Sequence, residues 1–331
     1  MISLRQHAVS IAAIFLALAV GIVLGSGVLS TSLVSGLRDD KAQMRDELQG
    51  EQDRNSVLTE RLNAADGFDA AVAPRIVRDT LTGRTVLMVA GPDADPADLD
   101  AVVAAVEAAG AAVTGRLSLT ESFVDATGAD LLRTTVTNVI PAGVQLQTGA
   151  VDQGSLTGDL LGAVLLVDPG TGQPRSTPEE RMLALTTLRS GGFLSFEDGT
   201  VEPAQSAIVV TGGRAAAGDG SGAEGSGAEG SGAEGSGNRG ALLARFAATL
   251  DGRSAGTVLA GRPDAATGNG PIAVVRADTA LSAGLSTVDN LDREAGRITT
   301  VLALGEQLTG GAGRYGTGPG ASSVTVGSAS R

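Results

Sequence analysis

The chain has 331 residues and a formal net charge of −13, and its length allows one large domain or two smaller ones. The acidic balance disfavours nucleic acid and anionic lipid as partners, because binding to phosphates requires clustered lysine and arginine. Lys41 is the only lysine among 24 basic residues. The absence of cysteine excludes disulfides, thiolate metal sites and cysteine nucleophiles.

Residues 8–29 form an apolar stretch of 22 positions without a charged residue. A helix of about 20 apolar residues crosses the hydrocarbon core of a bilayer, so the stretch predicts a transmembrane helix. Arg5 lies in the short leading segment 1–7 and favours a cytoplasmic N-terminus with the remainder outside. The alternative is a cleavable signal peptide, whose apolar region spans only about 7 to 15 residues. The length of the stretch favours an uncleaved anchor.

Small residues recur at every fourth position inside the predicted span, which places them on one helix face. They are Ala13, Ala17, Gly21 and Gly25. Such a face lets two transmembrane helices approach closely and predicts a helix pair. The alternative is an accidental register, because the chain has 48 glycines.

Residues 33–66 carry a seam at alternating spacings of three and four, the a/d pattern of a coiled coil. The seam contains Val34, Leu37, Met44, Leu48, Asn55, Leu58 and Leu62. Lys41 and Glu51 weaken it, whereas Asn55 falls at an a position, where a buried amide pair favours a two-stranded parallel coil. The pattern predicts the stalk of a parallel homodimer that ends near Gly67. A single solvated helix that packs on its own domain is the alternative.

Residues 69–309 alternate short apolar runs with amphipathic segments, which predicts a Rossmann-like α/β exterior domain. The predicted strands are residues 85–90, 112–117, 163–167, 193–196, 207–211, 257–260 and 272–275. The predicted helices are residues 69–81, 98–109, 129–139, 178–189, 242–250 and 296–308. The order of the strands does not follow from the sequence.

Two segments rich in glycine and serine are predicted to be irregular. Residues 218–238 contain three copies of Gly-Ser-Gly-Ala-Glu. This composition cannot bury enough apolar surface to offset the entropy of ordering, so we expect a flexible insert within the domain. Residues 310–331 form the second segment, a tail in which the only tyrosine, Tyr315, is expected to pack on the domain.

The exterior domain offers few residues for metal binding or catalysis. His7 is the only histidine and precedes the span, which excludes Ser-His-Asp triads, HExxH zinc sites and imidazole copper sites outside. The methionines beyond the span, Met44, Met88 and Met182, are far apart in sequence and lie in predicted packing positions. No catalytic, cofactor-binding or metal-binding residue is predicted, and we do not expect an enzyme.

Two acidic motifs allow more than one interpretation. The aspartates that follow the first predicted strand are Asp93, Asp95, Asp98 and Asp100. Their spacing resembles a calcium loop, but capping of the next helix is the favoured interpretation. They would also repel the phosphate that a glycine-rich Rossmann turn binds. Asp289 and Asp292 could act as paired carboxylates in acid–base chemistry, although a surface loop is favoured.

Several separated segments agree, in order, with one known family. They are the N-terminal MISLRQHAVSIAAIFLALAVGIVLGSGVLS, PRIVRD (74–79), VDQGSLTGDLLG (151–162), VVTGG (209–213), ARFAATL (244–250), GTVLAGR (256–262), STVDNLDREAGRIT (286–299) and RYGTGPGASSVTV (314–326). Over nearly its whole length the chain resembles the mycobacterial copper transport protein B family of actinobacterial envelope proteins. The resemblance implies a role in copper export and copper tolerance, and sometimes an outer-membrane pore. It implies no individual copper ligand.

The sequence leaves two functional hypotheses open. The first is a membrane-anchored homodimer in copper homeostasis or efflux without a high-affinity copper site of its own; copper itself follows from the resemblance only. The second is a dimeric scaffold for cell-envelope assembly or cell division that presents its α/β domain to a protein partner. The predicted location is the cell membrane, in a single pass, with the outer membrane of a mycobacterial-type envelope as the alternative. Seven aromatic residues are too few for the aromatic girdles of a transmembrane barrel.

Overall fold

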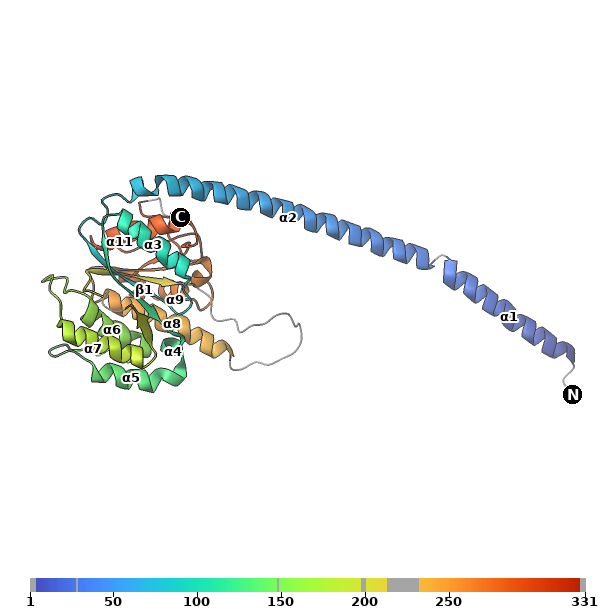
Figure 1. The fold of residues 1–331 in the computed structure, drawn as a ribbon. Helices are drawn as coiled ribbons and strands as arrows, with labels where there is room; N and C mark the ends of the chain where they lie inside the picture. Colours follow the sequence, from blue (N-terminus) through green and yellow to red (C-terminus); the bar gives the residue numbers. More distant parts are fainter. Residues whose placement is uncertain (1–3, 28, 148, 198–200, 213–231, 328–331) are drawn as a thin grey trace. The chain divides into compact units, whose positions relative to one another are not determined.

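The structure is a computed structural model that describes residues 4–27, 29–147, 149–197, 201–212 and 232–327. The chain divides into two compact units, Met1–Ala65 and Asp66–Arg331. The first unit is helical, and the second is a mixed α/β domain (Figure 1).

The described residues of the first unit lie in helix α1 and in the greater part of helix α2. Helix α1 (Leu4–Gly27) contains the window Gln6–Val23, which has a mean hydropathy of 2.1 and no buried residue, and it is long and apolar enough to cross a membrane. Helix α2 (Leu29–Ile76) continues without a break through Gly67, where the sequence predicted an end to the stalk. The predicted helix 69–81 is therefore the last part of α2 followed by turns.

The domain is built on a seven-stranded sheet with the order β3-β2-β1-β4-β5-β6-β7. All neighbouring strands are parallel except β3, which runs antiparallel to β2. The strands are β1 (Thr85–Ala90), β2 (Ala112–Leu119), β3 (Leu194–Phe196), β4 (Ser206–Thr211), β5 (Thr257–Gly261), β6 (Ser286–Val288) and β7 (Arg314–Tyr315). Central strands β4 and β5 are buried along their whole length, as expected for parallel strands covered on both faces.

Helices cover both faces of the sheet and create two hydrophobic cores (Figure 1). One core lies under α3 (Pro96–Ala108) and α11 (Glu294–Gln307). The other lies under a larger group of helices and short helical turns. These are α4 (Glu121–Val124), α5 (Ala129–Asn138), α6 (Gln153–Leu165), α7 (Pro178–Ser190), α8 (Gly232–Asp251), η2 (Pro263–Ala266), α9 (Pro271–Ala277) and α10 (Thr279–Gly284). The short turn η1 (Ala126–Gly128) has no buried residue.

Two predicted strands are wrong. Residues 163–165 are the last turn of α6, and residues 272–275 lie in α9. A short apolar run fits a buried strand and a buried helix equally well, and α6 is buried on nearly every side, so it shows no amphipathic period. Helix α9 is marked instead by Pro271 at its first position, a common start for a helix. Strands β6 and β7 were not predicted, because they have only three and two residues.

The glycine-rich segments are only partly covered by the described residues. Helix α8 begins at Gly232, so the end of the predicted insert 218–238 has a helical backbone and not a loop. The remainder of the predicted insert lies outside the described residues. In the tail, β7 pairs with β6, and the side chain of Tyr315 is buried, as expected for a residue that packs on the domain.

A glycine face allows α6 to pack directly on the backbone of α8. Gly154, Gly158 and Gly162 recur at every fourth residue of α6. A Cβ atom at Gly158 would lie 2.6 Å from the carbonyl oxygen of Phe246, and one at Gly162 would lie 2.7 Å from the Cβ of Arg253. At Gly154 the overlap with the Leu242 carbonyl would be greater still. Glycine is required at Gly154 and Gly158 because the backbones of the two helices are in contact there, and at Gly162 because the side chain of Arg253, just after the end of α8, packs against it.

Candidate functional site at the carboxyl edge of the sheet

The edge of the sheet at which the parallel strands end carries a network of arginine and aspartate side chains. In open α/β sheets, ligands bind outside the carboxyl ends of the strands, where the strand order reverses. In this sheet β1 and β4 are neighbours, β2 lies beyond β1, and β5, β6 and β7 lie beyond β4. The expected position of a ligand site is therefore the loop after β1 and its surroundings.

The chain's own backbone fills the space between the ends of β1 and β4. The Thr211 hydroxyl donates to Asp93 Oδ1 at 3.0 Å, and the Gly91 amide donates to the Val210 carbonyl at 2.7 Å. A Cβ atom at Gly212 would overlap the carbonyl oxygen of Asp93. The loop after β1 thus occupies the position at which a phosphate would lie in a nucleotide-binding sheet.

The aspartates after β1 begin helix α3. Asp95 is the N-cap residue and accepts a hydrogen bond from the Ala97 amide at 2.9 Å, and Pro96 occupies the first helical position. This is the capping arrangement that the sequence favoured over a calcium loop. Within the described ranges, no group of three or more histidine, cysteine, aspartate or glutamate side chains is placed to hold a metal ion.

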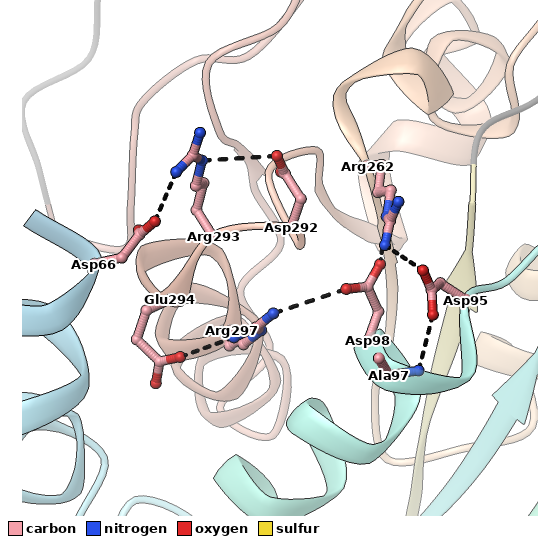
Figure 2. A network of polar contacts seen from close by, with 9 residues as sticks. All are labelled: Asp66, Asp95, Ala97, Asp98, Arg262, Asp292, Arg293, Glu294 and Arg297. Carbon is pink, nitrogen blue, oxygen red and sulfur yellow. Dashed lines mark hydrogen bonds and ion pairs between the residues drawn. The ribbon is translucent and has the colours of Figure 1, made fainter. Parts of the chain in front are cut away.

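Arg262 follows β5 and joins it to the start of α3 (Figure 2). Its Nε donates to Asp98 Oδ2 at 2.6 Å, and its Nη2 donates to Asp95 Oδ2 at 2.5 Å. The hydrogen bond to Asp98 and the two negative charges raise the pKa of Arg262. The carboxylate of Asp98 is almost fully buried, so Arg262 compensates a charge that water cannot reach.

The same network continues to α11 and to the end of α2 (Figure 2). Arg297 lies 3.8 Å from Asp98 and donates to Glu294 at 3.1 Å. Arg293, the N-cap residue of α11, donates to Asp66 of α2 at 2.7 Å, and this hydrogen bond raises the pKa of Arg293. The arginines therefore tie the end of α2, α3, α11 and β5 together through alternating charges.

A second ion pair lies deeper, after β6. Asp289 is fully buried and accepts hydrogen bonds from Arg276 Nη1 at 2.6 Å, from the Thr317 amide at 2.8 Å and from the Gly318 amide at 3.0 Å. Gly316 has a φ of +125°, and a Cβ atom there would overlap the Asp289 carboxylate. Glycine lets the C-terminal loop wrap closely around this buried charge.

Arg276 uses its remaining donors to hold the same C-terminal loop. Its Nη2 donates to the Tyr315 carbonyl at 2.7 Å, its Nη1 donates to the Pro319 carbonyl at 2.9 Å, and its Nε donates to the Thr287 hydroxyl at 3.1 Å. Burial lowers the pKa of Arg276, and the hydrogen bond and charge of Asp289 oppose that effect.

The interpretation of Asp289 and Asp292 as a surface pair is wrong for Asp289. Asp289 is paired with Arg276 in the interior, whereas Asp292 is about one-third exposed and lies 3.8 Å from Arg293. Arg262, Arg276 and Arg293 were not predicted from the sequence. Arg262 could have been found because it directly follows an apolar strand at the edge where parallel strands end. Arg276 could not, because its contacts depend on the C-terminal loop.

The network compensates its own charges. Arg262, Arg276, Arg293 and Arg297 each lie within ion-pair distance of at least one carboxylate. The carboxylates of these ion pairs belong to different elements of the fold. The ion pairs therefore hold the end of α2, α3, α11 and the C-terminal loop against the sheet, which is a structural role.

The predicted membrane and stalk residues lie on α1 and α2. Ala13, Ala17 and Gly21 are exposed on α1, together with large apolar neighbours such as Phe15 and Leu16. Four apolar seam residues of α2 are 48–70% exposed, and Asn55 is exposed beside them; the four are Met44, Leu48, Leu58 and Leu62. The side chains of Gly25, Val34 and Leu37 lie outside the described residues.

The described residues define the class of the chain as a mostly parallel α/β domain preceded by a long exposed helix and by an N-terminal helix that is long and apolar enough to cross a membrane. A family model described as "Copper transport outer membrane protein, MctB" matches residues 1–326. The copper transporters MctB of Mycobacterium tuberculosis and Mycobacterium bovis are each 45% identical over 329 residues, which cover 98% of this chain and 99% of theirs. MctB of Mycobacterium leprae is 45% identical over 332 residues with the same coverage. The chain belongs to the MctB family, which confirms the resemblance seen in the sequence motifs.

Replacing Arg262 by glutamine is expected to lower the free energy of unfolding of the domain by about 1 to 2 kcal/mol. The substitution leaves the Asp98 carboxylate buried without its closest cation. The loss stays modest because Arg262 is itself partly exposed to water. Tyr315 is buried and is the only tyrosine in a chain without tryptophan, so its fluorescence reports urea unfolding of the domain. Arg116→Gln is the matched control, because its ion pair with Asp100 is exposed on both sides and should change stability by less than about 0.5 kcal/mol. Equal losses in the two variants would contradict this role for Arg262.

Proposed function

We propose that the chain acts in copper transport and copper homeostasis as an integral envelope protein. The observation that carries this proposal is the 45% identity to proteins named copper transporter MctB, over 98% of this chain. The family match extends from the predicted membrane helix to the C-terminal loop that surrounds Asp289. It therefore includes the predicted anchor, the long helix and the α/β domain.

We propose further that the chain moves copper with partners and has no high-affinity copper site of its own. Copper(I) prefers thiolate, thioether and imidazole ligands. The sequence has no cysteine, and its single histidine, His7, precedes the membrane helix. Met88 is fully buried in β1, whereas Met44 and Met182 are exposed on different helices. These positions support packing and surface roles for the methionines.

The proposed topology is a single pass through the cell membrane with the N-terminus in the cytoplasm and the α/β domain outside. It is supported by the apolar window Gln6–Val23 and by Arg5 before it. The alternative is the outer membrane of a mycobacterial-type envelope, which is the location named in the family description.

The domain is proposed to be a Rossmann-like fold that serves as a binding scaffold and not as an enzyme. The order β3-β2-β1-β4-β5-β6 is that of the doubly wound dinucleotide-binding sheets, although β3 is antiparallel here. The loop after β1 fills the crevice of such a sheet, and Asp93 and Asp95 take the place of its phosphate-binding glycines. These features argue against a nucleotide in the crevice, and the second candidate function is presentation of the domain surface to an envelope protein.

The stalk is proposed to be a parallel two-stranded coiled coil, and cysteine crosslinking tests it in a chain that has no native cysteine. Leu58→Cys places a thiol at a d position, where the two helices of a parallel dimer approach closely, so oxidation in membranes should give a covalent dimer. Glu60→Cys is the control, because it falls on the outer f position and should stay monomeric. Absence of a dimer at residue 58, or equal crosslinking at both positions, would contradict the dimer.

Deletion of the gene tests the role in copper. Cells without the protein should accumulate copper and grow less well in added copper, and the full chain should restore both. Calorimetric titration of the full chain in detergent with copper(I) tests the absence of a site separately. Unchanged copper content and tolerance would overturn the role, whereas tight stoichiometric binding would overturn only the proposal that the chain has no high-affinity copper site of its own.

A further inference from the structure

A pocket of about 270 Å³ lies at the opposite edge of the sheet from the polar network, beside the end of α8 and one side of α10. These helices lead into the amino ends of β5 and β6. The volume is slightly below the range of about 300 to 1,000 Å³ typical of ligand pockets, which limits an occupant to a small molecule. Nothing in the proposed function uses this pocket.

Asp251 is the acidic group of the pocket, and only one of its oxygens is occupied. Asp251 Oδ1 accepts a hydrogen bond from the Thr257 amide at 2.8 Å. Asp251 Oδ2 faces Gly284, where a Cβ atom would lie only 3.2 Å away, and no donor among the described residues reaches it. Burial raises the pKa of Asp251 to about 7, against the smaller opposing effect of the Thr257 hydrogen bond.

The surroundings of Asp251 favour a positive charge. Asp251 is the last residue of α8, a 20-residue helix whose C-terminal carbonyl groups add partial negative charge. Arg245 is the only other charged residue that lines the pocket in the described part of the chain, and it lies 3.7 Å from Asp152 at the start of α6. The guanidinium group of Arg245 is thus paired with Asp152 and not with Asp251.

The remaining wall has an apolar side that is suited to an alkyl group. Ala248, Leu281 and Leu285 line the pocket beside Asp251, and Ala280 lies exposed at its rim. The uncharged polar side chains of Gln147, Ser155 and Thr249 complete the lining. A divalent metal ion would require several oxygen ligands, whereas the pocket supplies one carboxylate. We propose that this pocket binds a small alkylammonium ion, whose ammonium group donates to Asp251 Oδ2 and whose alkyl chain packs on the leucines.

The proposal gives binding a defined dependence on pH. An ammonium ion pairs with the ionised form of Asp251. As the pH falls through about 7, Asp251 takes up a proton and the affinity for the cation falls. Binding should therefore be tighter at pH 8 than at pH 6, by roughly tenfold.

The test is a nuclear magnetic resonance titration of the full chain in detergent micelles with n-butylammonium chloride, and with n-butanol as the neutral isostere. Wild-type protein should bind the cation in preference to the alcohol, and Asp251→Asn should weaken binding of the cation about tenfold or more. Asp264→Asn is the control, because Asp264 is exposed and does not line the pocket.

A second variant covers the case in which Asp251→Asn does not fold. Ala280→Trp fills the rim from an exposed position and should abolish binding while circular dichroism shows a folded domain. Equal affinity for n-butanol, unchanged binding in Asp251→Asn or Ala280→Trp, or equal affinity at pH 6 and pH 8 would each overturn the proposal.

Discussion

Asp289→Asn is expected to lower the free energy of unfolding of the α/β domain by about 3 to 5 kcal/mol, the usual cost of breaking a buried ion pair from one side. The substitution removes the charge that Arg276 requires, while the guanidinium group stays in the interior against two backbone carbonyls. Urea unfolding followed by Tyr315 fluorescence measures the loss, because the Tyr315 side chain is buried in the folded domain and its backbone carbonyl accepts a hydrogen bond from Arg276.

The control for this prediction is Asp292→Asn, three residues further along the same loop. Asp292 is about one-third exposed and lies 3.8 Å from Arg293, so its loss should cost less than about 0.5 kcal/mol. Arg276→Met completes the experiment: alone it should be as damaging as Asp289→Asn, and the double variant should lose much less than the sum. Additive losses would show that the two side chains do not act as a pair.

Gly158→Val is expected to destabilise the domain by about 3 kcal/mol, at the upper end of the cost of overpacking a core. Its Cβ would meet backbone atoms of Phe246 at 2.6 to 3.3 Å, and backbone cannot move aside as a flexible side chain can. Helices α6 and α8 would have to separate, which would disturb the edge-to-face contact of Phe246 with Phe123. The same unfolding measurement checks the result.

Gly67→Ala is the contrasting glycine substitution, and it should raise stability where Gly158→Val lowers it. Gly67 lies inside α2, and a Cβ atom there would meet nothing within 4 Å. Alanine should therefore raise helix stability by about 0.5 to 1 kcal/mol, because it restricts the unfolded chain more than glycine does. A neutral Gly158→Val would contradict the contact between α6 and α8, whereas a large loss for Gly67→Ala would contradict the open surroundings of Gly67.

The features that could be predicted from the sequence were those with local signals. The apolar run of α1 needs only its own composition, and strands such as Thr85–Ala90 and Ser206–Thr211 are uniform apolar runs between turns. The N-cap at Asp95 is likewise a local pattern, because an aspartate followed by proline opens a helix wherever it occurs. The family could also be assigned from ordered motifs.

The features that could not be predicted depend on residues far apart in the chain. Helix α6 was taken partly for a strand because its burial against α8 removes the amphipathic period by which helices are recognised. Strand β7 has two residues and forms only because β6 is beside it. In the candidate site, Arg262 meets carboxylates more than 160 residues away in sequence, and no local pattern encodes that pairing.

The sequence by itself determined the apolar helix, the heptad pattern of the long helix, the alternating α/β character and the family, because each depends on near neighbours or on residue order. Only the tertiary structure decided that β1 lies beside β4, that the loop after β1 closes the crevice there, and that Asp289 is an interior charge held by Arg276. The physical reason is that strand order and the pairing of buried charges depend on contacts between residues that are far apart in the sequence. A carboxylate in a loop has the same local sequence whether the fold leaves it in water or surrounds it with amides and a guanidinium group.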